Sequence, residues 1–512
     1  MSLTAAIATV ACLIFVAKLL KIDRAAAPDL SKALWVPSVW FLYCASRPLD
    51  EWFQTGPLIE SSGNAIESGS VVDRYFLSVL VVIGLVILNQ RRIHWPQAIR
   101  NNFWLFALLL FMLVSILWSD FPYVSLKRWV KTAGTAIMAL VVLSEAEPYD
   151  AMLAVLRRTV YCVIPFSILL AKYYPSLGVS FGRASGVPTY LGVTVSKNAL
   201  GEVCMLAAFF CIWSLVARRD EMDGAQAVRG QTAAEFILMI LAFFMIKGPS
   251  GYGATQATYS ATCIAVLLVG LGLFFLMRQF RIRLAQLGAW AVFILIGGGM
   301  VTIAFSLLNT SPIALAAGLL GRSETLTGRS DLIWNALLPI AWQHPVLGLG
   351  YGAFWITPVP DLILNVNEAH NGYLDVFIEL GGVGLILVAL VVGMYFRKAR
   401  HELEENFHWG AFRVAYLAMF LLHNWTETTL LRSREIMWNL FVLFAVVYPK
   451  EWTGRVDNDR IRMEEECSEV EETFLEAEGV AAPPAVLDGS AKSTLSSPLA
   501  SPTNLRIVPA DI

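Results

Sequence analysis

The stretch that decides the fold is GGVGLILVALVVGMYF, residues 381–396. It contains no charged residue, and the whole apolar run 373–396 is about as long as the roughly 20 residues that cross the hydrocarbon core of a membrane. Runs of this kind recur between residues 4 and 448. Because lipid offers no hydrogen-bond partner to open backbone groups, such runs are stable there only as helices. The sequence therefore predicts an all-α, polytopic transmembrane helical bundle of about 12–13 spans.

The composition agrees with this fold class. Of 512 residues, 57% are hydrophobic and 15% are charged, whereas about a quarter of the residues in a soluble domain are charged. The mean hydropathy is +0.61. A net charge of −2 leaves no basic surface for nucleic acid, so nucleic acid is excluded as a partner and membrane lipid is expected around the chain.

Thirteen apolar runs are candidate spans. They are residues 3–20, 33–46, 75–88, 103–118, 130–144, 152–173, 199–217, 233–246, 258–277, 284–307, 373–396, 411–425 and 436–448.

Basic residues predict the orientation, because Lys and Arg are retained on the cytoplasmic side. They cluster in alternate connections, which leaves the N-terminus and the connections 50–73, 174–197, 309–372 and 426–435 outside the cell inner membrane. We expect N-terminal transmembrane helices in residues 1–117, a core in residues 118–448 with a large extracytoplasmic loop at 309–372, and a disordered cytoplasmic tail in residues 449–512.

A few basic residues in the predicted outer connections oppose this trend, mainly Arg183, Lys197, Arg322 and Arg329. A guanidinium group at a membrane boundary can bind a pyrophosphate with two parallel hydrogen bonds. Arg329 also follows a glycine at an expected helix start, where free backbone N–H groups favour an anion. The alternative for each is contact with lipid phosphates or with nearby acids. Lys127, Arg128 and Lys131 fit that alternative at least as well.

Two histidines flank a glycine-rich outer segment. His344 begins HPVLGLGYGAF, residues 344–354, whose glycines allow a tight turn and close approach of backbone to a ligand. His370 lies in AHNGYLD, residues 369–375, directly before an apolar run. An imidazole there could take a proton from a sugar hydroxyl, or it could simply cap the helix.

A polar cluster, His423, Asn424, Thr426 and Glu427, lies at the outer end of another span, where ionisable groups are costly unless they are paired or used. Glu427 could position an acceptor or pair with an outer arginine, and structural pairing is favoured. Neither a zinc-binding nor a nucleotide-binding motif is present in the sequence, so we expect no metal and no cofactor.

These residues carry a resemblance. Residues 327–385 are similar to the O-antigen ligase and polymerase superfamily of bacterial membrane proteins, through TGR at 327–329, HPVLGLGYGAF, AHNGYLD and ELGGVGL at 379–385. Further segments resemble the exopolysaccharide-polymerase branch: WSDFP at 118–122, RASG at 183–186, SKNALG at 196–201 and NWTE at 424–427.

The resemblance implies a metal-independent, inverting membrane glycosyltransferase of the C-type class that uses a polyprenyl-pyrophosphate-linked glycan. It implies that Arg183 and Arg329 bind the pyrophosphate, that His370 activates the acceptor hydroxyl, and that Lys197 is a third cation. Asn371, Glu427 and His344 would support the acceptor. The active site would be extracytoplasmic, and the enzyme either a polymerase or an O-antigen-type ligase.

Two rival functions remain at this level. A transporter or flippase for an anion or a lipid-linked sugar suits the same number of spans, and Arg157 and Arg158 inside an apolar run are its best evidence. The second rival is a non-catalytic membrane protein that binds other polysaccharide-assembly proteins through its acidic C-terminal tail.

Overall fold

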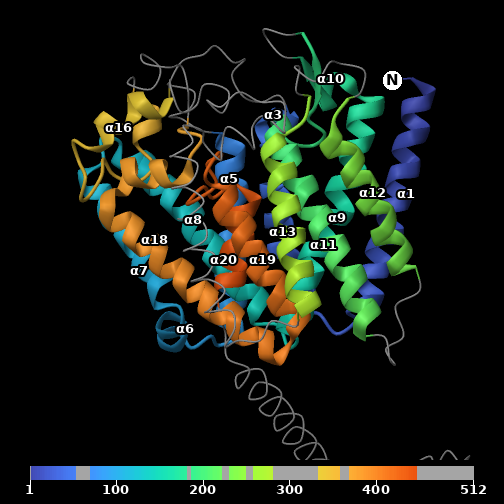
Figure 1. Cartoon of the computed structure of the whole chain (residues 1–512), viewed down its shortest axis with the longest axis horizontal. Coiled ribbons are helices and arrows are strands. Elements are labelled where there is room, and N and C mark those ends of the chain that lie inside the picture. Colours follow the sequence, from blue (N-terminus) through green and yellow to red (C-terminus); the bar gives the residue numbers. More distant parts are fainter. Residues whose placement is uncertain are drawn as a thin grey trace, which may run out of the picture. The chain divides into compact units, whose positions relative to one another are not determined.

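The described part of the chain forms a bundle of helices with one small two-stranded sheet (Figure 1). The computed structural model describes residues 2–53, 70–181, 186–221, 230–249, 258–280, 333–357 and 368–446. All of these residues belong to one compact unit, residues 1–453.

In its first half the unit contains α1 (Leu3–Ala26), η1 (Lys32–Leu34), α2 (Trp35–Cys44), α3 (Leu49–Phe53), α5 (Val71–Gln90), α6 (Trp95–Asn101), α7 (Phe103–Val114), η2 (Ser115–Trp118), α8 (Pro122–Leu143), α9 (Pro148–Tyr173), α10 (Pro175–Gly178), and the antiparallel strands β1 (Val179–Phe181) and β2 (Pro188–Tyr190). The second half contains α11 (Lys197–Glu221), α12 (Gln231–Lys247), α13 (Ala261–Phe280), α16 (Asn335–Ala341), η4 (Phe354–Ile356), α18 (Gly372–Glu405), α19 (Phe407–His423) and α20 (Ile436–Ala445).

The predicted all-α membrane fold is confirmed. Twelve of the thirteen predicted spans contain helix, and the remaining one, residues 284–307, lies outside the described residues. By length and composition alone, six of the described helices could cross a membrane, or seven if the pair Trp95–Asn101 and Phe103–Trp118, bent by 97°, counts as one span. This number is smaller than 12–13 because α2, α12, α19 and α20 are short and α8 carries lysine and arginine.

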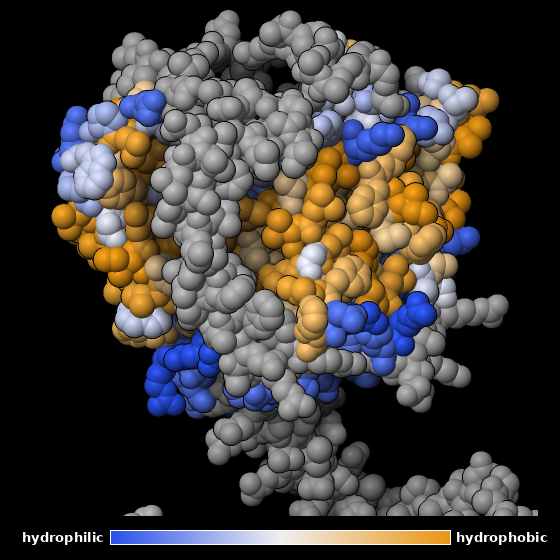
Figure 2. Space-filling model, in the orientation of Figure 1, coloured by the Kyte–Doolittle hydropathy of each residue, from blue (hydrophilic) through white to orange (hydrophobic). Residues whose placement is uncertain are grey.

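The helices run between two polar ends. The N-terminus, α3, α10 and α16 lie at one end of the bundle and α6 at the other (Figure 1). On the face shown in Figure 2, an apolar band over the described helices separates polar zones at the two ends. A band of this kind is what a bilayer requires of the surface of a helical bundle.

Local sequence explains how several helices begin. Pro122 and Pro148 occupy the first turn of α8 and α9, where a missing N–H costs nothing. Asn371 and Asn406 accept hydrogen bonds from first-turn N–H groups of α18 and α19. Asn371, the residue after His370, therefore fixes the point at which α18 starts.

Most buried apolar side chains form one large core, in which α11 packs on α12, α13 on α19, and α18 on α19. A second, smaller apolar cluster joins α16, η4 and the start of α18 through Leu337, Phe354 and Ile378. In this cluster Trp334 donates a hydrogen bond from Nε1 to the carbonyl of Ala369, at 2.9 Å. The smaller cluster therefore supports the segment that carries His370.

Candidate functional site

His370 is held in place by its neighbours on both sides. It is one of the few described residues other than glycine with a positive φ, +50°. Such a conformation is uncommon outside glycine, although histidine tolerates it better than bulky or branched residues. Directly after it, Asn371 Oδ1 accepts hydrogen bonds from the N–H groups of Tyr373 and Leu374, at 3.1 and 3.0 Å. The turn therefore ends at a fixed helix start, with the imidazole beside it.

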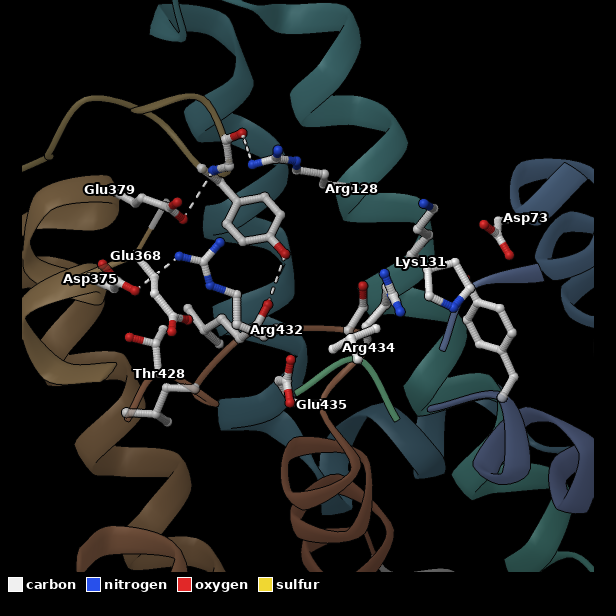
Figure 3. Close-up of a pocket in the computed structure, with 18 of the residues that line it drawn as sticks. Asp73, Arg128, Lys131, Glu368, Asp375, Glu379, Thr428, Arg432, Arg434 and Glu435 are labelled. Carbon is white, nitrogen blue, oxygen red and sulfur yellow. Dashed lines mark hydrogen bonds and ion pairs between the residues drawn. The ribbon is translucent and has the colours of Figure 1, made fainter. Parts of the chain in front are cut away.

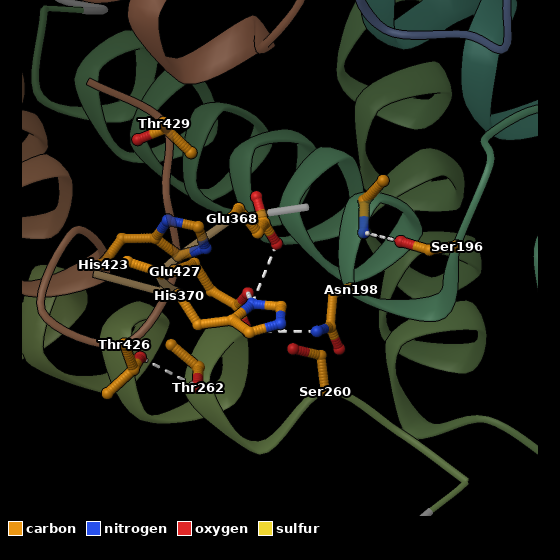
Figure 4. A network of polar contacts seen from close by, with 12 residues as sticks. Ser196, Asn198, Ser260, Thr262, Glu368, His370, His423, Thr426, Glu427 and Thr429 are labelled. Carbon is orange, nitrogen blue, oxygen red and sulfur yellow. Dashed lines mark hydrogen bonds and ion pairs between the residues drawn. The ribbon is translucent and has the colours of Figure 1, made fainter. Parts of the chain in front are cut away.

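Two carboxylates face one nitrogen of the imidazole (Figure 4). Nδ1 of His370 lies 2.8 Å from Oε1 of Glu368 and 3.4 Å from Oε2 of Glu427. Carboxylates accept hydrogen bonds, so we assign the proton of the neutral ring to Nδ1, which makes Nε2 the proton-accepting nitrogen. The His370 side chain is 26% exposed, so a ligand can reach the ring.

Glu427 is fixed in turn by a second layer of contacts. Its Oε1 accepts a hydrogen bond from Nδ2 of Asn198 at 3.0 Å. Its neighbour Thr426 bonds to Thr262, near the start of α13, with 3.1 Å between the hydroxyl oxygens. Among the described residues Glu427 contacts His370 and Asn198, while its expected partners Arg183, Arg322 and Arg329 lie outside the described residues. This arrangement can orient a histidine as a general base.

The segments AHNGYLD and NWTE meet through close backbone contact. The N–H of Gly372 donates to the carbonyl of Asn424, at 2.9 Å. A Cβ at position 372 would lie 2.2 Å from Oδ1 of Asn424, so only glycine allows this approach. The Asn424 side chain also accepts hydrogen bonds from the N–H groups of Thr429 and Leu430. One asparagine therefore organises both sides of the His370 cluster.

The same cluster has ligand atoms of the kinds that bind metals. Glu368, His370 and Glu427 each offer one atom, and these atoms lie within 4.8 Å of one another. A histidine nitrogen with two carboxylate oxygens suits several divalent ions. The geometry thus accommodates either an oriented base or a metal ion.

A cavity of about 410 Å³ adjoins this cluster (Figure 3). Glu368 belongs to both, because it lines the cavity and contacts His370. The volume lies in the range of about 300–1,000 Å³ that is typical of ligand pockets. The lining comes from the N-terminal halves of α8 and α18, from the connection between α19 and α20, from the glycine-rich segment, and from residues near α3 and α5.

The cavity is rich in charge of both signs. Its cations are Arg128, Lys131, Arg432 and Arg434. Arg432 donates to Oδ2 of Asp375 at 2.9 Å. Burial alone would lower the pKa of Arg432, but the Asp375 carboxylate raises it above its usual value. Arg432 is therefore a fixed charge in the wall.

Acidic groups line the cavity as well. Asp375 and Glu379 lie on α18, while Asp50 and Asp73 come from the N-terminal helices α3 and α5. Glu435, directly before α20, is different because burial, and then the negative charge of Glu368, raise its pKa to about 7. Its charge therefore changes in the physiological pH range.

The glycine-rich segment 344–354 packs against a kink in α18. Gly381 interrupts that helix with φ +63°, and a Cβ on it would lie 2.4 Å from the carbonyl carbon of Val346. The N–H groups of Leu349 and Gly350 donate to the carbonyls of Ile378 and Glu379, each at 2.9 Å. In the structure, the close approach predicted for these glycines is thus to the protein's own backbone.

This packing also shapes the cavity. The carbonyl of Gly352 accepts a hydrogen bond from Nη1 of Arg128, at 2.6 Å, and its N–H donates to Oε2 of Glu379, at 3.0 Å. A Cβ at position 352 would lie 2.8 Å from Cδ of Arg128. The glycine segment therefore positions one cation and one carboxylate of the cavity.

The structure brings some predicted site residues together. His370 and Glu427 are in contact, Asn371 caps α18, and Lys197 begins α11 directly before Asn198. His344 lies in an exposed turn after α16, where its carbonyl accepts from the N–H of Gly348, at 3.0 Å. Arg183, Arg322 and Arg329 lie outside the described residues.

Four cationic residues of the cavity had no functional role in the sequence-based prediction. For Arg128 and Lys131 the sequence favours contact with lipid phosphates or nearby acids, and it does not single out Arg432 and Arg434. One sequence feature pointed to the latter two, because both lie in the predicted outer connection 426–435 and oppose the positive-inside trend. For Arg128 and Lys131, only the tertiary structure shows that they line the cavity.

Arg157 and Arg158, the best evidence for a transporter, are paired within the bundle. Their Nε atoms lie 2.8 Å from Oδ1 and Oδ2 of Asp23, and all three side chains are at most 6% exposed. Arg158 also donates to the hydroxyl of Ser38 and lies over the ring of Trp35. These contacts give both arginines a structural role.

Fold and site together define a class: a polytopic helical membrane protein with a histidine–carboxylate cluster and a charged cavity near one end of the bundle. The family model for O-antigen ligase matches residues 250–389, which include the glycine-rich segment and His370. The chain is also 24% identical, over 347 residues, to the exopolysaccharide production protein ExoQ of Rhizobium meliloti (strain 1021), covering 64% of this chain and 73% of that protein. The chain is thus similar to O-antigen ligase/polymerase-like membrane proteins, and the resemblance derived from its sequence motifs is confirmed.

Proposed function

We propose that this protein is a glycosyltransferase that polymerises, or transfers, polyprenyl-pyrophosphate-linked oligosaccharide repeat units in exopolysaccharide synthesis, at the outer face of the cytoplasmic membrane. The family match supports a membrane ligase or polymerase, and the similarity to an exopolysaccharide production protein supports the pathway. The observation that carries the proposal is the contact of His370 Nδ1 with Glu368 and Glu427 beside a charged cavity.

In the proposed reaction, an acceptor hydroxyl oxygen attacks the anomeric carbon of the lipid-linked glycan. The bond from that carbon to the pyrophosphate oxygen breaks with inversion, and the pyrophosphate leaves with the electron pair. Nε2 of His370 takes the hydroxyl proton, while Glu368 and Glu427 stabilise the imidazolium that forms. Arg183 and Arg329, with Lys197, would stabilise the charge on the leaving group, so no metal ion is needed in this proposal.

The direct test supplies purified full-length protein with lipid-linked oligosaccharide, in buffer with and without a chelator. We expect transfer to persist with the chelator. His370→Gln should lower the rate by about 10²–10⁴-fold, the usual contribution of a general base. His401→Gln is the matched control, because His401 lies near the other end of α18 with its side chain 71% exposed.

Two outcomes would contradict the mechanism. If the chelator abolishes transfer and a divalent ion restores it, Glu368, His370 and Glu427 hold a metal ion rather than a free base. If a correctly inserted His370→Gln protein transfers glycan at the native rate, His370 is not the base. Arg329→Ala should also slow transfer, by about 10²–10³-fold, since loss of one charge-stabilising donor typically costs that much.

Polymerase and ligase activities leave different intermediates. In cells that lack the protein, mass analysis of lipid-linked glycans should find single repeat units if it is a polymerase. Long unattached chains would instead indicate a ligase. Our proposal favours single repeat units, because ExoQ, to which the chain is similar, is an exopolysaccharide production protein.

A further inference from the structure

Three cationic side chains of the cavity have no carboxylate partner in the described part of the chain. Arg128 and Lys131 lie one turn apart on α8, and Arg434 lies just before α20. None forms an ion pair within 4.0 Å with another described residue, whereas Arg432, in the same cavity, is paired with Asp375. Figure 3 shows Lys131 and Arg434 between Asp73 on one side and Asp375 and Glu379 on the other.

Like charges that share a half-buried site repel one another, and an anion placed between them offsets the repulsion. Guanidinium and ammonium groups bind carboxylate or phosphate oxygens through charge-assisted hydrogen bonds. The side formed by Arg128, Lys131 and Arg434 therefore fits a negatively charged group.

Polar atoms in the cavity wall also lack partners. Oε1 of Glu379 and the hydroxyl of Thr428 are buried without a hydrogen bond to any described residue, and so is Nε of Arg434. Glu379 and Thr428 are only 5% and 4% exposed. Buried polar atoms are rarely left unsatisfied in folded proteins, so unpartnered polar atoms on residues that line a cavity favour a polar occupant there. Glu379 can accept from a hydroxyl, and Thr428 can donate or accept.

The cavity therefore combines three features. It has cations that fit an anion, it has polar groups that fit hydroxyls, and it is lined by Glu368, which also contacts the proposed base His370. A sugar that bears a carboxylate matches all three. Its hydroxyls would bind Glu379 and Thr428, its carboxylate would bind the cations, and one further hydroxyl would reach His370.

We propose that this cavity binds the terminal sugar of the acceptor, and that Arg128, Lys131 and Arg434 select an acidic sugar, of the hexuronic acid class, at that position. The assignment of this sugar to the acceptor rests on the proposed function. Binding of the sugar does not, because binding requires no reaction. The pyrophosphate of the donor is the competing occupant of the same cations.

The experiment uses two oligosaccharides that differ only in one terminal residue, a hexuronic acid or its carboxyl-reduced hexose. Binding to the full-length protein in lipid nanodiscs is measured by calorimetry, without donor. We expect the native protein to bind the acidic form more tightly. Lys131→Gln and Arg434→Gln should each weaken that binding about tenfold, the usual worth of a hydrogen bond to a charged group, and leave binding of the reduced form unchanged.

Lys127→Gln is the matched control, because Lys127 lies on the same helix and does not line the cavity. It should bind both oligosaccharides as the native protein does. Equal binding of the two oligosaccharides by the native protein would overturn the proposal. A second result would also overturn it. If Lys131→Gln and Arg434→Gln weaken binding of inorganic pyrophosphate but keep the preference for the acidic sugar, these cations bind the donor and not the acceptor.

The two proposals can fail separately. If the acidic oligosaccharide binds in the expected way and no glycan transfer is found, the subsite stands and the glycosyltransferase function fails. If transfer occurs with equal use of both acceptors, the function stands and the acidic-sugar subsite fails.

Discussion

His370 and the residues around it are held in conformations that local sequence does not favour. Besides His370, Leu431 has a positive φ, +59°, directly before Arg432. Its carbonyl accepts a hydrogen bond from the hydroxyl of Tyr351, at 3.0 Å. Non-glycine residues in this region cost on the order of 1–3 kcal/mol and persist when the surrounding structure enforces them. Both residues lie beside charged side chains of the site, which agrees with a functional role for this end of the bundle.

At this scale, Glu427→Gln tests whether the second carboxylate orients the base. The amide can keep the contact with Asn198 but cannot stabilise an imidazolium. We expect kcat for glycan transfer to fall by roughly tenfold or more, with KM nearly unchanged. The loss should be smaller than the roughly 10²–10⁴-fold rate contribution of the general base itself, because Glu427 only orients that base. Initial rates over a range of acceptor concentrations separate the two constants. A change confined to KM would contradict an orienting role.

Glu435→Gln tests the group that titrates near neutrality. Its pKa is raised from 4.5 to about 7 by burial and by the charge of Glu368. Between these values the unfolded chain has already lost the proton that the folded protein keeps, so the free energy of unfolding falls as pH rises from about 4.5 to 7. The native protein should therefore lose more thermal stability between pH 5 and pH 8 than the variant does. If the thermal midpoints of the two proteins change equally with pH, a group other than Glu435 causes the pH dependence of stability.

At the scale of elements, the central contact is that between the glycine-rich segment and the kinked helix α18. Residues 344–352 and 378–383 exchange backbone hydrogen bonds, as a strand pair would, although one partner is a helix interrupted at Gly381. The kink exposes carbonyl groups that a continuous helix would use internally. It therefore allows the loop to dock and to set the positions of Arg128 and Glu379.

Gly381→Ala should disrupt this docking. The new Cβ would meet the backbone of Val346 at a φ that alanine rarely adopts. We expect a loss of at least about 1–3 kcal/mol in the free energy of unfolding, measured in detergent. Gly393→Ala is the matched control on the same helix, because no atom lies within 4 Å of its added Cβ. It should be neutral or stabilising by up to about 1 kcal/mol. Equal effects of the two substitutions would contradict the proposed contact.

The ion pair between α1 and α9 gives a second prediction for the elements. Asp23→Asn leaves the buried guanidinium groups of Arg157 and Arg158 without their carboxylate. Removing one partner of a buried ion pair costs about 3–5 kcal/mol, so the thermal midpoint should drop markedly. Asp29→Asn, at an exposed position in the following connection, should change stability by no more than about 0.5 kcal/mol. A stable Asp23→Asn protein with anion flux in vesicles would instead revive the transporter hypothesis.

At the scale of the whole molecule, the main prediction concerns sidedness. Asp120 is exposed beside Ser119, which contacts Gly350 near the cavity, while Glu404 is exposed near the far end of α18. In intact cells, a membrane-impermeant thiol reagent should label Asp120→Cys. It should label Glu404→Cys only after permeabilisation, because the basic connections are expected inside. The reverse pattern would place the site in the cytoplasm.

Much of the helical architecture could be predicted from the sequence. Hydropathy and the length of each apolar run are local properties, so they located the helices without knowledge of tertiary contacts. The sequence also pointed to His370 and Glu427, because ionisable residues at the ends of apolar runs stand out against their neighbours, and their roles stay predictions. The extent of each domain, the role of the tail and the roles of Arg183 and Arg329 stay predictions.

What the sequence by itself determined is therefore the membrane class, the order of the helices and the family resemblance, since each follows from patterns within short stretches. Only the tertiary structure decided which charges share a cavity. Asp73, Arg128, Glu379 and Arg434 are more than 50 residues apart from one another along the chain and meet only because α5, α8, α18 and the connection before α20 pack together. Hydropathy carries no information on that packing, because a charge bound for a cavity and one bound for lipid head groups look the same in sequence.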